Sequence, residues 1–125
     1  MTFVNKVWGN EQWIVNSDKY CGKILVLHKQ YRCSIHYHKQ KDETFYIMNG
    51  AVLMELDGEK QVMHPGESIR VLPGQKHRFT GLSNAMIVEF STHHEDDDSY
   101  RESTSGFVPD DEFCSLSMRQ MACQT

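Results

Sequence analysis

Short runs of apolar residues alternate with polar residues along most of the chain. Branched and aromatic residues dominate runs 22–28 and 44–49, and run 85–91 has the same character. Such residues favour extended structure, and the runs are short for helices. Further runs of this kind lie at 33–38, 51–56, 60–63, 68–72 and 77–80. The pattern predicts about eight short strands and no long helix among them.

Turn signals separate the predicted strands. Asn49-Gly50 and Asp57-Gly58 are both hairpin signals, which predict antiparallel pairing of the strands on either side. Pro65-Gly66 and Pro73-Gly74 interrupt the chain again before the last core strands. Many short strands with turns between them predict an all-β, single-domain jelly-roll barrel.

The ends of the chain differ in composition from the predicted barrel. The first residues are polar apart from two tryptophans, and an acidic, polar run follows Phe90. A short helix is predicted to start at Asp110 or Asp111. We expect four parts: an N-terminal arm or extra strand (1–21), the barrel core (22–92), a polar acidic loop and linker (93–108) and a C-terminal tail (109–125).

Two histidines and a glutamate lie close together in the sequence SIHYHKQKDETF. In a strand, residues two apart point to the same face, about 6.5 to 7 Å from each other, so His36 and His38 should project together. Glu43 follows a polar stretch that can serve as a connection. If the strand from Glu43 runs back beside the first, one cavity receives two imidazoles and a carboxylate. This ligand set suits Mn, Fe, Co, Ni or Zn.

A fourth ligand is expected further along the chain. His77 opens the strand that follows the Pro73-Gly74 turn, so its side chain can enter the same cavity. Three histidines and one carboxylate leave positions open for water or substrate on a six-coordinate ion. The sequence therefore predicts a divalent metal site formed by His36, His38, Glu43 and His77.

The spacing of these residues resembles that of the cupins. The first cupin motif, G-x5-H-x-H-x4-E-x6-G, is matched at His36, His38, Glu43 and Gly50. The second, G-x5-P-x-G-x2-H-x3-N, is matched at Gly66, Gly74 and His77. Departures from the two motifs are Gln30, Leu72 with Pro73 one place late, and Gly81, and none of them removes a ligand. The resemblance implies a cupin barrel.

Three longer phrases resemble the cupin domain of type II mannose-6-phosphate isomerases and D-lyxose isomerases. They are KVWGNEQWIVNSDKYCGKIL, HYHKQKDETFYIMNG and VEFSTHHEDDDSYR, which together span most of the chain. The resemblance implies an aldose–ketose isomerase acting on a sugar or a sugar phosphate. Within it, Glu89 is expected to be the base, Lys41 an acid or oxyanion partner, and Arg101 a contact for one end of the substrate. Glu89 reaches the cavity only if the strand register turns it inward.

Charge and composition exclude several other partners. The net charge is −4, and no basic run interleaved with aromatic residues suggests nucleic acid. No apolar run approaches the roughly 20 residues needed to span a membrane, and Met1 to Trp8 lacks the apolar core of a signal peptide. The four cysteines form no C-x-x-C pair, which favours free thiols in a reducing compartment. We expect a cytoplasmic protein, and the resemblance to cupins implies a homodimer.

Two other functions fit a cupin with this ligand set. One is an iron-dependent dioxygenase, which would need neither Lys41 nor the phrase from Glu89 to Arg101. The other is a non-catalytic sugar-binding module. Oxygen uptake separates the first from an isomerase, and exchange of the sugar C2 proton with solvent separates the second.

Overall fold

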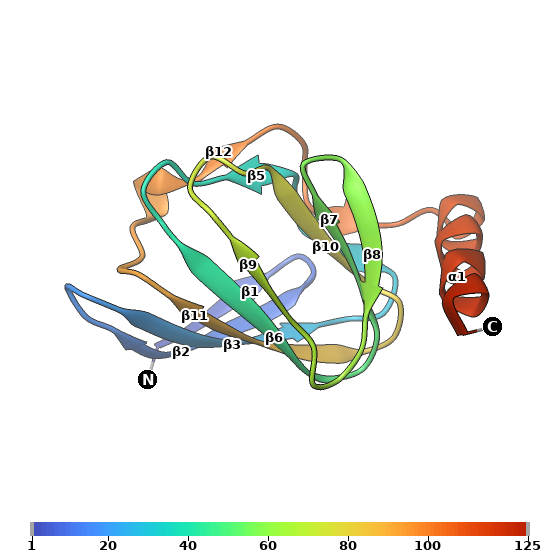
Figure 1. Cartoon of the computed structure of the whole chain (residues 1–125), viewed down its shortest axis with the longest axis horizontal. Helices are drawn as coiled ribbons and strands as arrows, with labels where there is room; N and C mark the ends of the chain where they lie inside the picture. Colours follow the sequence, from blue (N-terminus) through green and yellow to red (C-terminus); the bar gives the residue numbers. More distant parts are fainter. Residues whose placement is uncertain (1, 125) are drawn as a thin grey trace.

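Two antiparallel β-sheets face each other in the computed structural model, which describes residues 2–124 (Figure 1). The first sheet is six-stranded, in the order β1-β2-β3-β11-β6-β9. Its strands are β1 (Thr2–Lys6), β2 (Gly9–Asn16), β3 (Cys21–Leu27), β11 (Ala85–Ser91), β6 (Glu43–Asn49) and β9 (Ser68–Val71).

The second sheet is seven-stranded and is built around β10 (His77–Gly81). Strand β10 pairs with β4 and β5 on one side and with β7 on the other. The remaining strands are β4 (Tyr31–Arg32), β5 (His36–Tyr37), β7 (Val52–Leu56), β8 (Glu59–Met63), β12 (Tyr100–Arg101) and β13 (Gly106–Phe107). The predicted all-β jelly-roll architecture is confirmed.

The core lies between the two sheets because alternate residues of each strand point inward. Strand β3 buries Cys21, Lys23, Leu25 and Leu27, and exposes more of the residues between them. Apolar side chains of both sheets pack into one cluster: Trp8, Leu25, Leu27, Cys33, Phe45, Ile47, Val52, Met54, Met63, Val71, Phe79, Ala85 and Ile87. At one end of the barrel some inward-facing residues are polar, such as Lys23 on β3. A polar cavity therefore lies beside the apolar core.

Only one of the two predicted hairpins is present. Asp57 and Gly58, with φ of 49° and 85°, join the paired strands β7 and β8. Gly50 instead carries the chain from β6 in the first sheet to β7 in the second, so the Asn49-Gly50 hairpin was a wrong prediction. With φ of 80° and Asn84 O only 2.3 Å from where a Cβ would lie, Gly50 makes a turn between sheets that a larger residue could not make.

The segments on either side of the expected barrel core also contain strands. Strands β1 and β2 pair with each other, and β2 pairs with β3, so the N-terminal segment extends the first sheet. Within 93–108 lie a 3₁₀ turn, η1 (Asp96–Asp98), and the strands β12 and β13. Strand β12 pairs with β5 and β13 pairs with β4, so this polar segment adds two short strands at the β4–β5 edge of the second sheet.

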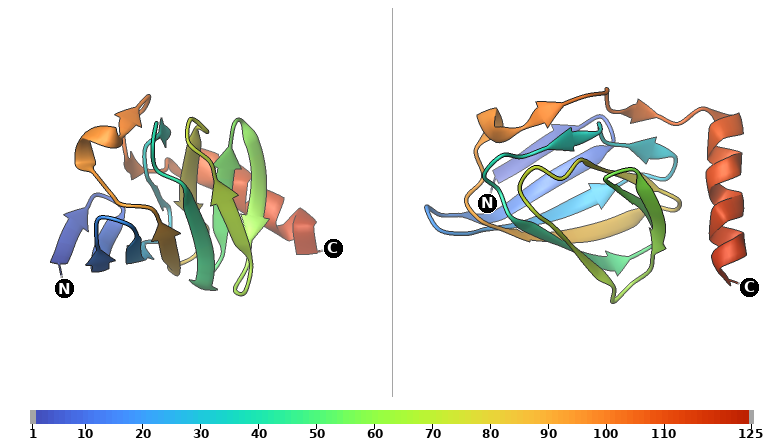
Figure 2. Two further views of the ribbon diagram at one scale, coloured as in Figure 1. Left: turned by 60° about the vertical axis from the view of Figure 1, so that its left-hand side comes forward. Right: turned by 45° about the horizontal axis from the view of Figure 1, so that its top comes forward.

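Helix α1 (Asp110–Gln124) forms the C-terminal tail and begins where the sequence predicted. Figure 2 shows it beside β8, at the far end of the molecule from the β1–β2 hairpin. Its residues Phe113 and Leu116 pack against a small apolar cluster formed by Ala51, Leu53 and Leu82. Within residues 2–124, no helix is long and apolar enough to cross a membrane.

Candidate functional site

Three histidines meet at the inner surface of the second sheet. His36 lies on β5 and is directly opposite His77, the first residue of β10, in the antiparallel register. His38 follows two residues after His36, just beyond the end of β5. One ring nitrogen from each of the three lies within 4.8 Å of the other two. The expected convergence of these imidazoles is therefore present in the structure.

Hydrogen bonds fix which ring nitrogen of each histidine faces the others. The Nδ1 atoms of His36, His38 and His77 lie 2.7, 3.0 and 3.1 Å from the carbonyl oxygens of Ser34, Asp98 and Gln75. A carbonyl can only accept, so each Nδ1 carries the proton and each Nε2 presents a lone pair. Burial, and then the neighbouring His77, lower the pKa of His36 to about 3, which keeps that ring neutral. Neutral imidazoles oriented by their second nitrogen are the form that binds metals.

Glu43 adds a carboxylate to the three imidazoles, but from the opposite sheet. It is the first residue of β6, which pairs with β11 and β9 and not with the histidine-bearing strand. The sequence analysis based the shared cavity on a pairing of these two strands, and that pairing is not formed. The ligands converge because the two sheets of the barrel face each other across the cavity.

The contacts of Glu43 test whether the cluster fits a cation. Glu43 Oε2 lies 3.2 Å from both His38 Nε2 and His77 Nε2. Among the described residues, neither Glu43 Oε2 nor His77 Nε2 has a hydrogen-bond partner, although both are buried. Burial alone would raise the pKa of Glu43, but its polar surroundings, among them the Lys41 ammonium, outweigh burial and hold this pKa well below its usual value. Buried lone pairs and an ionised carboxylate that face one another fit a divalent cation.

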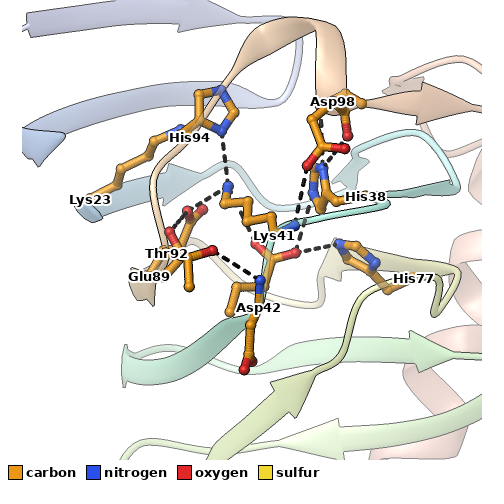
Figure 3. A network of polar contacts seen from close by, with 12 residues as sticks. Lys23, His38, Lys41, Asp42, His77, Glu89, Thr92, His94 and Asp98 are labelled. Carbon is orange, nitrogen blue, oxygen red and sulfur yellow. Dashed lines mark hydrogen bonds and ion pairs between the residues drawn. The ribbon is translucent and has the colours of Figure 1, made fainter. Parts of the chain in front are cut away.

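Lys41 is a buried residue of the cavity, although it lies in the polar stretch expected as a connection. Its ammonium nitrogen lies 2.7 Å from Glu89 Oε2, 3.5 Å from Glu43 Oε1 and 3.0 Å from His94 Nδ1 (Figure 3). Burial acts to lower the pKa of Lys41, but Glu89 and Glu43 outweigh it, so the pKa is raised. Lys41 is therefore a charged group placed between the candidate metal ligand Glu43 and the candidate base Glu89.

Glu89 points into the cavity from β11 and is buried. In the register of the first sheet it lies opposite Lys23 of β3 and Phe45 of β6, both of which also point inward. Ser91 Oγ donates a hydrogen bond of 3.0 Å to Glu89 Oε2. The strand register that the sequence left open thus turns Glu89 toward Lys41.

Arg101 lies at the rim of the cavity. It is exposed on β12, opposite His36 in the register of that strand pair, and it contributes to the cavity lining. Among the side chains of residues 2–118 its guanidinium has no ion pair with a carboxylate, so it is available to a ligand. The structure thus brings Lys41 and Glu89 into contact and places Arg101 separately, at the entrance.

The cavity has a volume of about 500 Å³, which is enough for a monosaccharide. One wall holds Glu43, Lys41 and two of the histidines, and the β1–β2 hairpin supplies another wall. Lining residues are Thr2, Val4, Lys6, Trp8, Glu11, Trp13, Lys23, Leu25, Cys33, Ser34, His36, His38, Lys41, Glu43, Phe45, Phe79, Glu89, His94, Asp96, Ser99, Arg101 and Ser105.

A second charged group in the cavity was missed by the sequence analysis. Lys23 is buried, with its Nζ 3.3 Å from Glu11 Oε1 and 4.2 Å from the centre of the Trp13 ring. Trp13 Nε1 donates to the same Glu11 oxygen at 2.8 Å. Burial would raise the pKa of Glu11, but Lys23, Trp13 and Lys6 outweigh it and lower this pKa. The sequence did contain a signal for this residue. In the alternation of the strand, Lys23 falls on the same face as the buried residues Leu25 and Leu27.

The acidic run after β11 also takes part in the site. Asp98 accepts hydrogen bonds from the backbone N–H groups of Lys39, Gln40 and Lys41 at 2.9 to 3.3 Å. Its own carbonyl accepts from His38 Nδ1. The sequence analysis treated this run as a polar loop, and only the pairing of distant segments shows that it holds the ligand loop.

Cys33 also lines the cavity, which strict strand alternation from the histidines does not predict. Residues 33–35 lie between β4 and β5 and belong to no strand. The side chains from residue 33 to residue 36 therefore need not point alternately to opposite faces. Burial raises the pKa of Cys33 to about 12, which keeps it a thiol. Cys21, Cys33 and Cys114 are free thiols, while the side chain of Cys123 lies outside the described residues.

Comparison with known families identifies the fold class. Residues 23–92 match the model of the cupin domain, so the chain belongs to the cupin family. An RmlC-like cupin from Shewanella frigidimarina superposes with a TM-score of 0.71, covering 77% of this chain and 86% of that one at 15% identity. At that identity the likeness shows the fold alone.

Two characterised relatives are more similar in sequence. The D-lyxose/D-mannose isomerase of Thermosediminibacter oceani is 31% identical over 111 residues, which cover 66% of this chain and 61% of the relative. The D-lyxose ketol-isomerase of Cohnella laeviribosi is 30% identical over 106 residues, covering 62% and 58% respectively. This chain thus spans about three fifths of the length of these relatives.

Proposed function

We propose that the protein is a metal-dependent aldose–ketose isomerase that acts on a sugar or a sugar phosphate, as mannose-6-phosphate isomerases do. The observation that carries the proposal is the position of Lys41, whose ammonium lies between the buried carboxylates of Glu43 and Glu89. Isomerisation moves a proton between two adjacent carbons, and this arrangement places an acid and a base side by side. The two sugar-isomerising relatives support the same reaction class.

The residues of the chain divide the proton transfers between them. Glu89 accepts the proton from C2 of the aldose, while Lys41 donates a proton to the C1 carbonyl oxygen. Lys41 then takes the hydroxyl proton from the C2 oxygen, and Glu89 returns its proton to C1. The product is the ketose, and both side chains regain their starting protonation. Arg101, at the rim, contacts the far end of the substrate, whether hydroxyl or phosphate.

His36, His38, Glu43 and His77 would hold the divalent ion, which the donor set allows to be Mn, Zn, Fe, Co or Ni. When bound, such an ion stabilises negative charge on adjacent oxygens of a sugar. The buried apolar side chains Phe45 and Phe79 exclude water from this side of the cavity.

The decisive experiment has two arms. Elemental analysis of the purified protein tests for a bound divalent metal. Incubation with D-lyxose, D-mannose and mannose 6-phosphate in deuterated water, followed by NMR, tests for exchange at C2 and for ketose formation. We expect deuterium at C2 and loss of exchange in the metal-stripped protein. Binding without exchange would support the sugar-binding alternative, and oxygen uptake with iron would support the dioxygenase.

The assembly and location of the protein stay predictions. The resemblance to cupins predicts a homodimer, which sedimentation velocity tests directly. The cysteine pattern predicts a cytoplasmic protein, and cell fractionation tests that prediction.

A further inference from the structure

His94 has no part in the proton transfers proposed above, yet its ring contacts the group at their centre. Lys41 Nζ has three acceptors around it: Glu89 Oε2 at 2.7 Å, His94 Nδ1 at 3.0 Å and Glu43 Oε1 at 3.5 Å. A lysine ammonium has three N–H groups and no lone pair. One N–H can be directed at each of these atoms, and two of the three atoms belong to the proposed chemistry. The third is His94.

The contact with Lys41 fixes the tautomer of His94. Because the ammonium can only donate, His94 Nδ1 must be unprotonated, and the ring proton of a neutral His94 lies on Nε2. Asp96 Oδ1 lies 2.9 Å from that Nε2 and accepts a hydrogen bond from its N–H group. This tautomer is opposite to that of the three candidate ligands, which carry the proton on Nδ1. Burial, and then Lys41 and Lys23, lower the pKa of His94, in agreement with a neutral ring.

The ring of His94 is held in place from the first sheet. Asn16 of β2 makes two hydrogen bonds to its backbone, accepting from His94 N at 2.9 Å and donating to His94 O at 3.1 Å. The Trp13 ring packs edge-on against the imidazole with centres 5.1 Å apart. His94 therefore reaches Lys41 from an anchored backbone, and Figure 3 shows its ring directed at the lysine.

We propose that His94, with its tautomer set by Lys41 and Asp96 together, is a positioning residue that holds the Lys41 ammonium between Glu43 and Glu89. The inference rests on the proposed isomerase function, because it is the proton transfers of Lys41 that need this position. A lysine side chain has four torsions, and two acceptors leave its third N–H free to turn the ammonium toward water. The third acceptor from His94 removes that freedom. Misplacement of a reacting group by about 1 Å costs up to about 100-fold in rate.

The kinetic test compares two substitutions at one site with a control beside it. His94→Leu removes the acceptor at similar volume, whereas His94→Asn keeps an oxygen near the place of Nδ1. We expect kcat for the exchange of D-mannose to fall about 10- to 100-fold in His94→Leu, with KM changed less than about threefold, and to recover at least partly in His94→Asn. His93→Leu is the control, because His93 bonds Ser17 O and does not line the cavity. Equal kcat in His94→Leu and the control would overturn the proposal.

A spectroscopic test does not need turnover. NMR of ¹⁵N-labelled histidine should show His94 protonated on Nε2 in the metal-loaded protein. NMR of ¹⁵N-labelled lysine should show a protected Lys41 ammonium signal, which is lost or moved in His94→Leu and kept in His94→Asn. A proton on His94 Nδ1, or an unchanged Lys41 signal in His94→Leu, would refute the positioning contact even if the enzyme is active. If the spectra are as expected but the protein does not exchange the C2 proton, the contact between His94 and Lys41 is confirmed. The proposed isomerase function, and with it the catalytic role of the contact, is then refuted.

Discussion

Lys41 and Glu89 form an ion pair inside the cavity, with Lys41 Nζ 2.7 Å from Glu89 Oε2 and both side chains almost fully buried. The two residues lie far apart in the sequence, one in the loop before β6 and one on β11. Glu43, the candidate ligand, lies on the other side of the same ammonium. One lysine therefore links the candidate metal site to the candidate base.

Glu89→Gln should abolish exchange at C2 while leaving the metal in place. The amide keeps the size of the side chain but cannot accept the substrate proton, so we expect kcat to fall by about 10³-fold or more. Metal content by elemental analysis should equal that of the wild type. Glu95→Gln, a change of an exposed carboxylate on the following segment, is the matched control and should keep full activity. Near wild-type exchange in Glu89→Gln would remove Glu89 from the mechanism.

Lys41→Met should reduce both turnover and stability. The substitution leaves two buried carboxylates without their shared cation, and removing one partner of a buried pair costs about 3–5 kcal/mol. Urea unfolding should show this loss in the free energy of unfolding, together with a large loss of kcat. Lys29→Met changes an exposed lysine away from the cavity and should cost less than about 0.5 kcal/mol. Equal unfolding midpoints for the two variants would show that the Lys41 pair is not a buried pair in solution.

His77→Ala should empty the metal site. The imidazole is one of four converging donors, so we expect metal affinity to fall more than about 100-fold, beyond the 10- to 100-fold typical of supporting residues. Competition with a coloured chelator measures the affinity. His64→Ala, on an exposed histidine that pairs with Glu67, should bind metal like the wild type. Unchanged affinity in His77→Ala would exclude it as a ligand.

Much of this architecture could be predicted from local sequence patterns. Alternating apolar residues gave the strands, and the two-residue spacing of His36 and His38 gave two candidate ligands, because both depend on short-range periodicity. Glu43 and His77 became candidates through their positions next to predicted turns and through the cupin motifs. Strand pairing was less predictable. The Asn49-Gly50 pair is a hairpin signal, yet the chain changes sheets there, because the inward faces of β6 and β7 belong to opposite sides of the core.

The parts of the site that the sequence analysis missed depend on long-range contacts. His94 and Asp98 reach the loop 39–41 from a segment far along the chain, and nothing in their local pattern distinguishes them from a solvated acidic loop. Lys41 was not missed, but it became a candidate only through the family resemblance, because its local pattern is that of an exposed loop residue. Lys23 was predictable in principle, because its strand position is in phase with buried leucines.

Asp98→Ala should weaken both the ligand loop and the metal site. Its carboxylate accepts from the backbone N–H groups of Lys39, Gln40 and Lys41. The variant keeps the backbone carbonyl that accepts from His38 Nδ1, but loses the carboxylate contacts that hold this carbonyl beside the loop. Loss of such a supporting residue typically costs 10- to 100-fold in metal affinity, and we expect a fall of about that size here. Asp97→Ala is the control in the same 3₁₀ turn and should change affinity less than about twofold. Calorimetric titration of the metal-stripped proteins compares them, and equal affinities would show that the loop keeps its shape without Asp98.

Glu11→Gln should change how stability depends on pH. Contacts with Lys23, Trp13 and Lys6 hold the pKa of Glu11 below its ordinary value although burial opposes this. The unfolded chain then binds more protons than the folded chain as the pH falls below about 4.3 toward the lowered pKa. The stabilising contribution of Glu11 is therefore complete above the unfolded pKa and is lost as the pH falls through the folded pKa. Glutamine has no charge to lose, so urea unfolding of metal-stripped Glu11→Gln should show a shallower fall in stability across that range.

The same variant should be less stable than the wild type at neutral pH, because Lys23 keeps a hydrogen bond but loses its counter-charge. We expect a cost of about 2 kcal/mol at pH 7, shrinking as the pH falls and Glu11 of the wild type takes up its proton. Glu59→Gln removes an exposed carboxylate from β8 and should follow the wild-type curve. If the free energy of unfolding of Glu11→Gln and of the wild type changed with pH in parallel, Glu11 would have the same pKa in the folded and unfolded chains. The ion pair with Lys23 would then not stabilise the cavity wall electrostatically.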